Sequence, residues 1–347
     1  MDWHFVFSQA LTQAIGPTML VYALGAIGLN LQFGYTGLLN FGQAAFAAVG
    51  AYGLALSVVA FGLPFWWGIL IGLAAAVVLA LLMGIPTLRL RADYLAIVTI
   101  AAAEIVRRLF RATVWSEHTG GSDGMRGFSD PFFALNPLPE DATWSFLFVS
   151  MDSGRLAVDF GLFDLQYSHR DLWVMTVGWT LVAFFCVVLG LLVHSPWGRV
   201  LKGIREDEEA VRSLGKNVFA YKMQALVIGG LIGAVAGFLF ALSRANVQPD
   251  TFSTDFTFYF YVVLILGGAA RIFGPVLGAA VFWFLYNIFA QGLSQAINAD
   301  LISPDLINQT QVGPLVFFLL GLGMVLLLIF RPQGILGNRR ELMLDVR

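Results

Sequence analysis

The stretch that decides the fold is KMQALVIGGLIGAVAGFLFALS, residues 222–243. After Lys222 it contains no charged side chain, and nearly all of its residues are apolar. The hydrocarbon core of a bilayer is about 30 Å thick, so a helix needs roughly 20 such residues to cross it. Residues 222–243 are therefore predicted to form a membrane-spanning helix.

The rest of the chain has the same character. Of its 347 residues, 58% are hydrophobic and 12% are charged, whereas about 25% of the residues of a soluble domain are charged. Because a compact soluble fold needs a polar shell, this composition excludes a soluble enzyme and a disordered scaffold. The net charge of −2 supplies no basic field for phosphate, so nucleic acid is not an expected partner. Membrane lipid is.

Further apolar stretches predict an all-α, polytopic transmembrane bundle of about eight to nine spans. They cover approximately 10–32, 37–60, 64–88, 93–110, 172–194, 222–243, 256–270, 272–292 and 311–330. The segment 37–60 is either a full span or a broken, re-entrant helix, since Asn40 and Gln43 lie there among glycines. We expect residues 1–347 to form a single transmembrane domain.

Positive charges indicate which loops face the cytoplasm. All the lysines lie between residues 195 and 222, together with several arginines, and more arginines follow residue 330. Both regions, and hence the C-terminus, are predicted to be cytoplasmic. The segment 112–170 is mainly acidic and is predicted to be an external polar loop. Arg107, Arg108 and Arg111 precede it, and either snorkel to the surface or pair with acidic residues of that loop.

The cytoplasmic loop 195–221 has a helical pattern. Opposite charges at positions 202/206, 205/209 and 208/212 have the spacing that brings side chains together on a helix. Val200, Leu201, Ile204, Val211 and Leu214 would form its apolar face. We therefore predict an amphipathic helix over 200–214 that Gly215 ends. It is either a solvated loop that only fixes topology or an element that docks a soluble partner.

Within this loop, Glu209, Ala210, Val211 and Gly215 resemble the E-A-A-x-x-x-G coupling motif of ABC importer permeases, with Val211 in place of the second alanine. Four other stretches resemble the permeases of high-affinity branched-chain amino acid ABC importers, and they occur in the same order. They are GLNLQFGYTGLLNFGQAAFAAVGAY (28–52), PTLRLRADYLAIVTIAAAEIVR (86–107), TGGSDG (119–124) and ARIFGPVLGAA (270–280).

The resemblance covers about 28–335 and implies an ABC importer permease in the cytoplasmic membrane of a prokaryote. It implies four partners: a second homologous permease, two ATP-binding subunits and an external solute-binding protein. Urea and amide permeases share much of the pattern, so they remain an alternative for the solute. Residues expected to couple the permease to the ATP-binding subunits are Arg205, Glu208, Glu209, Ala210 and Gly215.

Uncharged polar residues near the N-terminus could line a translocation path: Gln32, Tyr35, Asn40 and Gln43. Irregular backbone in a membrane is tolerated only beside protein or water. The alternative is that the amides make hydrogen bonds between helices. Glycines repeat every four residues at 229/233/237, at 68/72 and at 274/278. This spacing predicts close helix packing, either within the chain or against a second permease.

No catalytic site, cofactor site or metal site is expected in this chain. It has no Walker motif, so any ATP would be hydrolysed by separate subunits, and its histidines show no metal-ligand spacing. Cys186 lies in an apolar run and is expected to be simple packing. An ion-coupled secondary transporter is the rival from another class. Glu104 is its proton-relay candidate, and pairing of Glu104 with Arg107 or Arg108 is the alternative.

Overall fold

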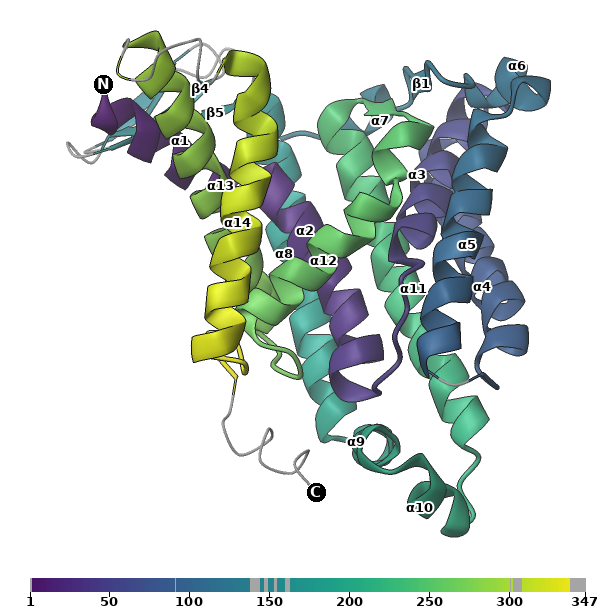
Figure 1. Ribbon diagram of the computed structural model, residues 1–347. Coiled ribbons are helices and arrows are strands. Elements are labelled where there is room, and N and C mark those ends of the chain that lie inside the picture. The colour runs from purple at the N-terminus through teal and green to yellow at the C-terminus, as the bar shows by residue number, and fades with distance from the viewer. Residues whose placement is uncertain are drawn as a thin grey trace.

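The computed structural model describes residues 2–90, 92–137, 144–146, 149–152, 155–159, 163–299, 301 and 308–337. Its longer helices are α1 Trp3–Ile15, α2 Pro17–Leu29, α3 Gln43–Val59, α4 Phe65–Thr87, α5 Ala92–Arg111, α8 His169–His194, α11 Val218–Arg244, α12 Thr254–Gly267, α13 Gly274–Asn298 and α14 Val312–Phe330. Two short helices between α8 and α11 are described with the site. Helices therefore form the body of the molecule, as predicted (Figure 1).

Five of the described helices are long and apolar enough to cross a membrane: α4, α8, α11, α13 and α14, the last extended at its start by the 3-10 turn Gln309–Gln311. A sixth span is formed if α1 and Pro17–Tyr35 count as one, although they are bent by 41°. Helices α3 and α12 are apolar but shorter. The chain is thus a polytopic, helical membrane protein, and its purely apolar helices are fewer than the predicted stretches.

The predicted span 10–32 is wrong in its limits. The first helix ends at Ile15, Gly16 is extended, and Pro17 starts α2. Proline has no N–H to donate to the preceding turn, so it starts a helix well and interrupts one readily. After Leu29 the chain continues as a π-helix, Asn30–Tyr35. A hydropathy window cannot detect either change, because all these residues are predominantly uncharged.

The segment 37–60 is broken. Residues 37–42 are irregular, and α3 begins only at Gln43. Helix α3 is buried along most of its length, between α4 and α11. The interpretation of 37–60 as one uninterrupted helix is therefore excluded.

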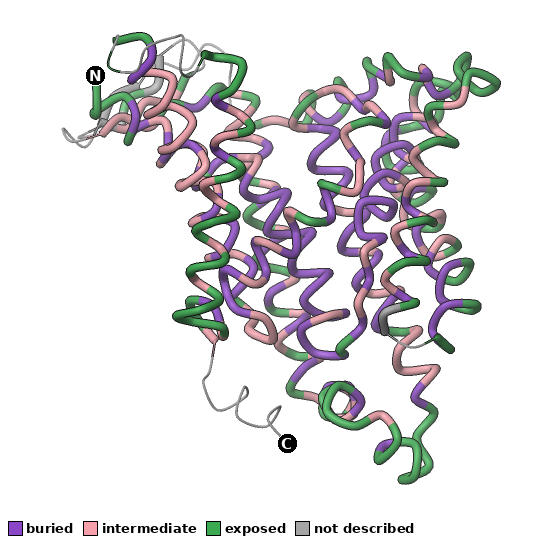
Figure 2. The backbone as a smooth tube through the Cα atoms, in the orientation of Figure 1, coloured by how far each residue is buried: buried purple, intermediate pink, exposed green. Residues whose placement is uncertain are grey.

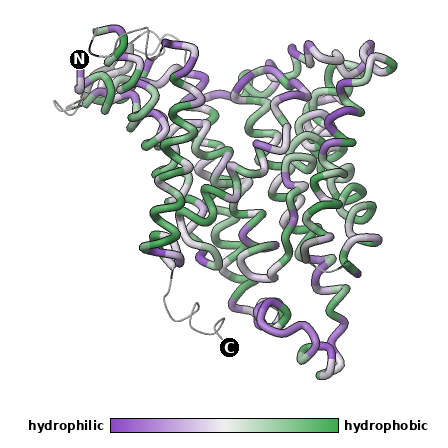
Figure 3. Tube along the Cα trace, viewed as in Figure 1, coloured by the Kyte–Doolittle hydropathy of each residue, from purple (hydrophilic) through white to green (hydrophobic). Residues whose placement is uncertain are grey.

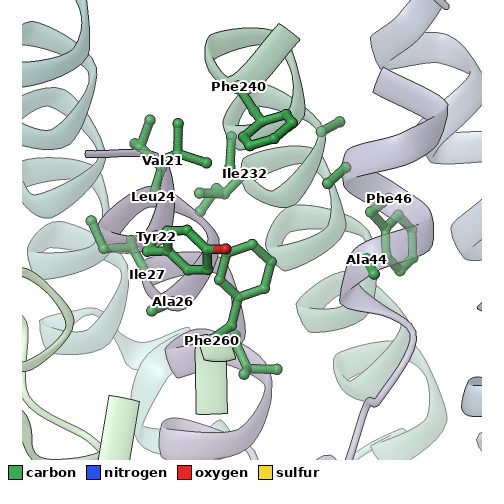
Figure 4. Packing of buried hydrophobic residues seen from close by; sticks show 14 of the residues in the cluster. Val21, Tyr22, Leu24, Ala26, Ile27, Ala44, Phe46, Ile232, Phe240 and Phe260 are labelled. Atoms are coloured by element: carbon green, nitrogen blue, oxygen red, sulfur yellow. The ribbon is translucent and has the colours of Figure 1, made fainter. Parts of the chain in front are cut away.

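Two helices form the centre of the bundle. α2 and α11 lie side by side, and α11 also packs on α3, α4 and α8. Figure 2 shows buried residues concentrated on these inner helices. Figure 4 shows buried side chains of this cluster, with Tyr22, Leu24 and Ile27 from α2 and Ile232 and Phe240 from α11. Outer helices expose apolar side chains instead, among them Leu82 on α4 and Phe318 on α14.

The predicted external loop contains more structure than expected of an all-α chain. It holds the 3-10 turn Thr113–Trp115, the short helices α6 Ser116–Thr119 and α7 Asp130–Phe133, strand β1 Met125–Arg126, and the strands β2 Trp144–Phe146, β3 Val149–Asp152, β4 Arg155–Asp159 and β5 Asp164–Ser168. Strands β2 to β5 form an antiparallel sheet in chain order, with Leu156 opposite Tyr167.

Contacts hold this loop to the helices at two places. The Tyr167 hydroxyl donates a hydrogen bond to the Thr12 carbonyl oxygen at 2.9 Å, and burial raises the pKa of Tyr167 to about 12. Strand β1 pairs antiparallel with β6, Asn246–Val247, beyond the end of α11; a 3-10 turn, Pro249–Phe252, then leads to α12. The described part of the loop lies at one end of the bundle (Figure 1).

Polar residues are gathered at the two ends of the bundle (Figure 3). Two short helices after α8 lie at the end opposite the 112–170 loop, and the end of α14 lies near them (Figure 1). This grouping agrees with the predicted sidedness of the loops. Residues after Gly337, which include most of the C-terminal arginines, lie outside the described residues, as does Arg91.

Candidate functional site

The loop 195–221 forms two helices rather than the single predicted helix 200–214. They are α9, Pro196–Glu206, and α10, Glu208–Ser213. Between them Asp207 is extended (φ −153°, ψ 102°), and its carboxylate accepts hydrogen bonds from the main-chain N–H groups of Glu209 and Ala210, at 2.9 and 3.0 Å. An aspartate in this position caps a new helix, which explains the break.

The break changes the predicted charge pairs. Glu208 and Arg212 pair at 2.8 Å within α10, as predicted. Glu208 also pairs with Lys222 at the start of α11. Among the ion pairs of the described residues, 202/206 and 205/209 do not occur. The extended residue Asp207 separates positions 205 and 209, so they do not lie on one helix face. Positions 202 and 206 are both in α9, but the Lys202 ammonium lies over the Tyr35 ring.

The apolar face is confirmed in part. Leu201, Ile204 and Val211 are buried against the bundle. Leu214 is 78% exposed, so its assignment to the buried face is wrong. It belongs instead to the tip of the loop, where Glu209, Ala210 and Gly215 are also exposed. Gly215 has φ +75°, the left-handed conformation that ends α10.

Helix α9 is attached to the broken segment that follows α2. The Arg205 guanidinium donates a hydrogen bond to the Gly34 carbonyl oxygen at 2.5 Å. The Lys202 ammonium lies 5.8 Å from the centroid of the Tyr35 ring. Gly37 has φ +74°, and a Cβ there would lie 3.3 Å from the Arg205 side chain. Helix α9, which precedes the exposed tip, is therefore in direct contact with the π-helix 30–35.

Buried amides tie this π-helix to the centre of the bundle. The Asn40 amide donates to Gln32 Oε1 at 2.8 Å, and Gln32 donates to the Leu226 carbonyl oxygen of α11 at 3.1 Å. Gln43 donates to the Gly229 carbonyl oxygen, one turn further along α11, at 3.0 Å. The three amides thus find acceptors on one another and on α11, and tie the broken segment to that helix.

Gln32, Tyr35, Asn40 and Gln43 are at most 3% exposed. In this conformation the three amides make the hydrogen bonds between helices that were the alternative to a path lining. A role in lining the path stays a prediction, as do the coupling roles of Arg205, Glu208, Glu209, Ala210 and Gly215. What the structure adds is a contact between the two groups, because Arg205 binds Gly34, which is adjacent to Tyr35.

Asn30 was not identified from the sequence, and its side chain makes hydrogen bonds that fix the other side of the π-helix. Its amide donates to the Arg271 carbonyl oxygen at 2.7 Å and accepts from the Ala270 N–H at 2.8 Å. The turn between α12 and α13 is thus fixed to α2. The signal was present, since Asn30 is a polar residue in the apolar stretch that carries Gln32, but its partner could not be read from the sequence.

The arginines at the end of α5 are neutralised by two acids. Glu104 binds Arg107 at 2.7 Å and Arg108 at 2.8 Å. Asp250, in the 3-10 turn before α12, binds Arg107 and, at 3.2 Å, Arg111. Asp250 lies outside 112–170, so among the described residues Arg107 and Arg111 pair with this turn and not with that loop, which was one of their two alternatives. Glu104 is in the structural pair that was the alternative to a proton relay.

The glycine patterns are used within the chain. A Cβ on Gly229 would lie 2.6 Å from the Gly28 carbonyl oxygen, and one on Gly237 would lie 2.0 Å from that of Ala47. Similar contacts occur at Gly72, against Phe238, and at Gly278, against Val263. These glycines let α11 approach α2, α3 and α4 closely, and α13 approach α12, so at these contacts the packing is within the chain.

Residues 14–329 match the family described as the permease component of branched-chain amino acid transport systems. The high-affinity branched-chain amino acid transport system permease protein LivM of Escherichia coli is 32% identical over 97% of this chain and 72% of its own length. A probable branched-chain amino acid permease of Methanocaldococcus jannaschii is 24% identical over 92% of this chain and 91% of its length. A ribose import permease of Escherichia coli, RbsC, is 29% identical over 34% of this chain. The chain therefore belongs to the family of permease components of branched-chain amino acid transport systems.

Proposed function

We propose that this chain is the permease subunit of an ATP-driven importer that carries leucine, isoleucine and valine across the cytoplasmic membrane of a prokaryote. The observation that carries the proposal is the similarity to branched-chain amino acid permeases along nearly the whole chain. The chain itself is a transport subunit and not an enzyme, and ATP is hydrolysed on partner subunits.

The tip formed by Glu209, Ala210, Leu214 and Gly215 is the docking surface for an ATP-binding subunit. An exposed leucine beside an exposed acid suits a protein partner better than water, because burial of the leucine side chain contributes about 1.5–3 kcal/mol. Its base is fixed to the bundle through the Glu208–Lys222 pair. A displacement of the tip is therefore passed to α11 through this pair, and to α9 through the contact between α9 and α10.

Helix α9 passes that displacement to the π-helix through the hydrogen bond of Arg205 with Gly34. The buried amides then carry it to α11. Packed helices shift between discrete arrangements rather than deforming continuously, so closure of the ATP-binding subunits would switch the pathway between outward and inward access. In the second arrangement Gln32, Tyr35, Asn40 and Gln43 would line the path.

Each chain presents one such tip, so two permeases would engage two ATP-binding subunits. The second permease is a homologue of this chain, and an external solute-binding protein delivers the amino acid to the end of the bundle opposite α9. The exposed apolar side chains of α14 and α4, such as Phe318 and Leu82, face lipid or the second permease.

We place α9, α10 and the C-terminus in the cytoplasm, because the lysines of the chain are concentrated around them. We also place α3, α5 and α12 within the membrane, since they pack between or against the longer helices. With the five longer helices and the bent pair α1–α2, this gives about eight to nine spans.

An ion-coupled transporter is disfavoured by Glu104, whose carboxylate is already bound by two arginines. Transport of urea or short amides stays the alternative for the solute. An ion-coupled transporter should move solute without ATP, and a urea or amide permease should take up urea in preference to the branched-chain amino acids.

The experiment is affinity purification of the tagged chain from its native membrane in mild detergent, followed by mass spectrometry and reconstitution in liposomes. An ATP-binding subunit should be recovered, and uptake of labelled leucine, isoleucine and valine should require ATP and exceed that of urea. A chain that purifies alone and moves solute without ATP would contradict the proposal.

Glu209→Gln supplies the matched test of the docking tip. It should leave the complex largely assembled but abolish ATP-dependent uptake, whereas Glu206→Gln, at an exposed acid of α9, should behave as the unaltered protein. Unchanged uptake with Glu209→Gln would remove Glu209 from the coupling surface.

A further inference from the structure

A cavity of about 310 Å³ lies between the end of α11, the start of α12 and the side of α2. Its volume falls at the lower end of the range of small-ligand sites, about 300–1,000 Å³. The cavity lies beside β6, which pairs with β1 of the 112–170 loop. Helix α11 spans 27 residues from Val218, near α10, to Arg244 at the cavity, so about 40 Å of helix separates the cavity from the coupling tip.

Two opposite charges line this cavity. Arg244 is in the last turn of α11, and Asp255 is in the first turn of α12. Neither belongs to an ion pair among the described residues. Each is at the helix end whose dipole stabilises its charge, and the Arg244 guanidinium also lies 5.5 Å from the centroid of the Phe240 ring. Both groups can therefore stay charged without pairing with each other.

A third lining residue has an unused polar atom. The side-chain oxygen of Asn246 is buried and has no hydrogen-bond partner. Buried polar atoms are almost always satisfied, so an exception requires an explanation. Asn246 thus adds to the lining residues an acceptor that no described group of the chain satisfies.

Aromatic rings form part of the remaining wall, beside the polar residues Gln248, Thr251 and Ser253. The Tyr22 ring lies 5.3 Å from Phe256 and 6.1 Å from Tyr259, measured between centroids. Phe240 of α11 lies 5.5 Å from Phe256, and Figure 4 shows the Tyr22 ring beside that of Phe260 of α12. Such a wall receives an apolar side chain, and the cavity thus combines a cation, an anion and an apolar surface within the volume of a small molecule.

From these contacts we propose that the cavity is a reception site for the zwitterion of an apolar α-amino acid. Arg244 binds the carboxylate, Asp255 binds the ammonium group, and the aromatic rings of the wall receive the branched side chain. The site rests on the proposed function and narrows its substrate class, because urea or a neutral amide cannot satisfy both charges. It lies on the side of the bundle from which the solute would arrive.

The test uses the purified transporter in nanodiscs, without the solute-binding protein and without ATP. Saturation-transfer difference NMR measures the binding of L-leucine, isopentylamine, which lacks the carboxylate, and 4-methylpentanoate, which lacks the ammonium group. Leucine should bind to the unaltered protein about 10- to 100-fold more tightly than either analogue, the effect of losing one charged hydrogen bond. Equal binding of the three compounds would overturn the proposal without any variant.

Variants then assign the groups. Arg244→Gln should abolish the preference for leucine over isopentylamine, and Asp255→Asn the preference over 4-methylpentanoate. Arg126→Gln and Asp123→Asn, exposed charges at the same end, should change neither. If ATP drives leucine uptake by the unaltered transporter but both cavity variants bind leucine normally, the site is wrong and the transport function stands. If no branched-chain amino acid is taken up at all, the proposed function fails.

Discussion

The Arg205 guanidinium donates a hydrogen bond to the carbonyl oxygen of Gly34, 171 residues away along the chain. Gly34 lies in the π-helix that follows α2, and Arg205 lies in the last turn of α9. The bond joins the exposed helices at one end of the bundle to the buried amides at its centre. It is the direct polar contact through which a partner at the tip can influence α2.

Replacement of Arg205 by methionine should therefore uncouple the two parts. A hydrogen bond from a charged donor contributes about 1.5–3 kcal/mol, and its loss frees α9 from the π-helix while the tip remains intact. In the reconstituted transporter we expect ATP hydrolysis to continue and leucine uptake to fall strongly. The measurement is the ratio of leucine transported to ATP hydrolysed.

Arg199→Met is the control for this prediction, because Arg199 is exposed on the same helix. It removes the same charge from α9 without touching Gly34. An equal fall of the ratio in both variants would show that the general charge of α9, and not the Arg205–Gly34 bond, matters.

Gly215 ends α10 with φ +75°, and its Cβ position is open. A valine there would strain the backbone, since the left-handed conformation costs a side chain about 1–2 kcal/mol. Asparagine tolerates this conformation and adds comparable bulk. We expect Gly215→Val to reduce recovery of the ATP-binding subunit in affinity purification, and Gly215→Asn to retain it. Loss with both variants would indicate a contact of the glycine itself with the partner.

The sequence predicted the membrane class and the helical architecture because both depend on composition. It also identified Leu201, Ile204 and Val211 as buried, since an amphipathic helix repeats in a local pattern. It failed at Leu214 because α10 ends at Ser213, so Leu214 lies beyond the helix whose pattern predicted its burial. It also missed that Asp207 caps a second helix. An aspartate followed by two glutamates is a helix-start signal, and that signal competes with the regular spacing of charges.

The polar contacts were harder to predict. Gln32, Asn40 and Gln43 were recognisable as unusual in an apolar stretch, but their acceptors are main-chain carbonyl groups of α11. Main-chain groups carry no sequence signature, so neither Leu226 nor Gly34 could be identified as a partner. The cavity that Arg244 and Asp255 line could not be predicted either. In the sequence both residues are ordinary charges at helix ends, and only the folded structure brings the end of α11 close to the start of α12.

Asn40 offers a test of whether the buried amides serve structure. Its amide donates to Gln32, and its side-chain oxygen accepts from the Gly42 N–H at 2.8 Å. Asn40→Leu leaves both partners unsatisfied, at about 1–3 kcal/mol each. We expect a lower midpoint of thermal unfolding in detergent, measured by fluorescence-detected size exclusion. Asn217→Leu, at an exposed helix cap, should have the smaller effect; a normal midpoint with impaired uptake for Asn40→Leu would favour path lining instead.

The contact of α11 with α3 should be sensitive to a single methyl group. A Cβ on Gly237 would lie 2.0 Å from the Ala47 carbonyl oxygen, whereas a Cβ on Gly321 of α14 meets no atom within 4 Å. Overpacking of this kind costs about 1–3 kcal/mol, while alanine favours a helix over glycine by about 1 kcal/mol. In the same thermal assay Gly237→Ala should lower the midpoint and Gly321→Ala should leave it unchanged or raise it. If Gly321→Ala lowers the midpoint of the assembled transporter but not that of the isolated chain, the second permease lies against α14. An unchanged midpoint for Gly237→Ala would show that α11 and α3 are not closely packed.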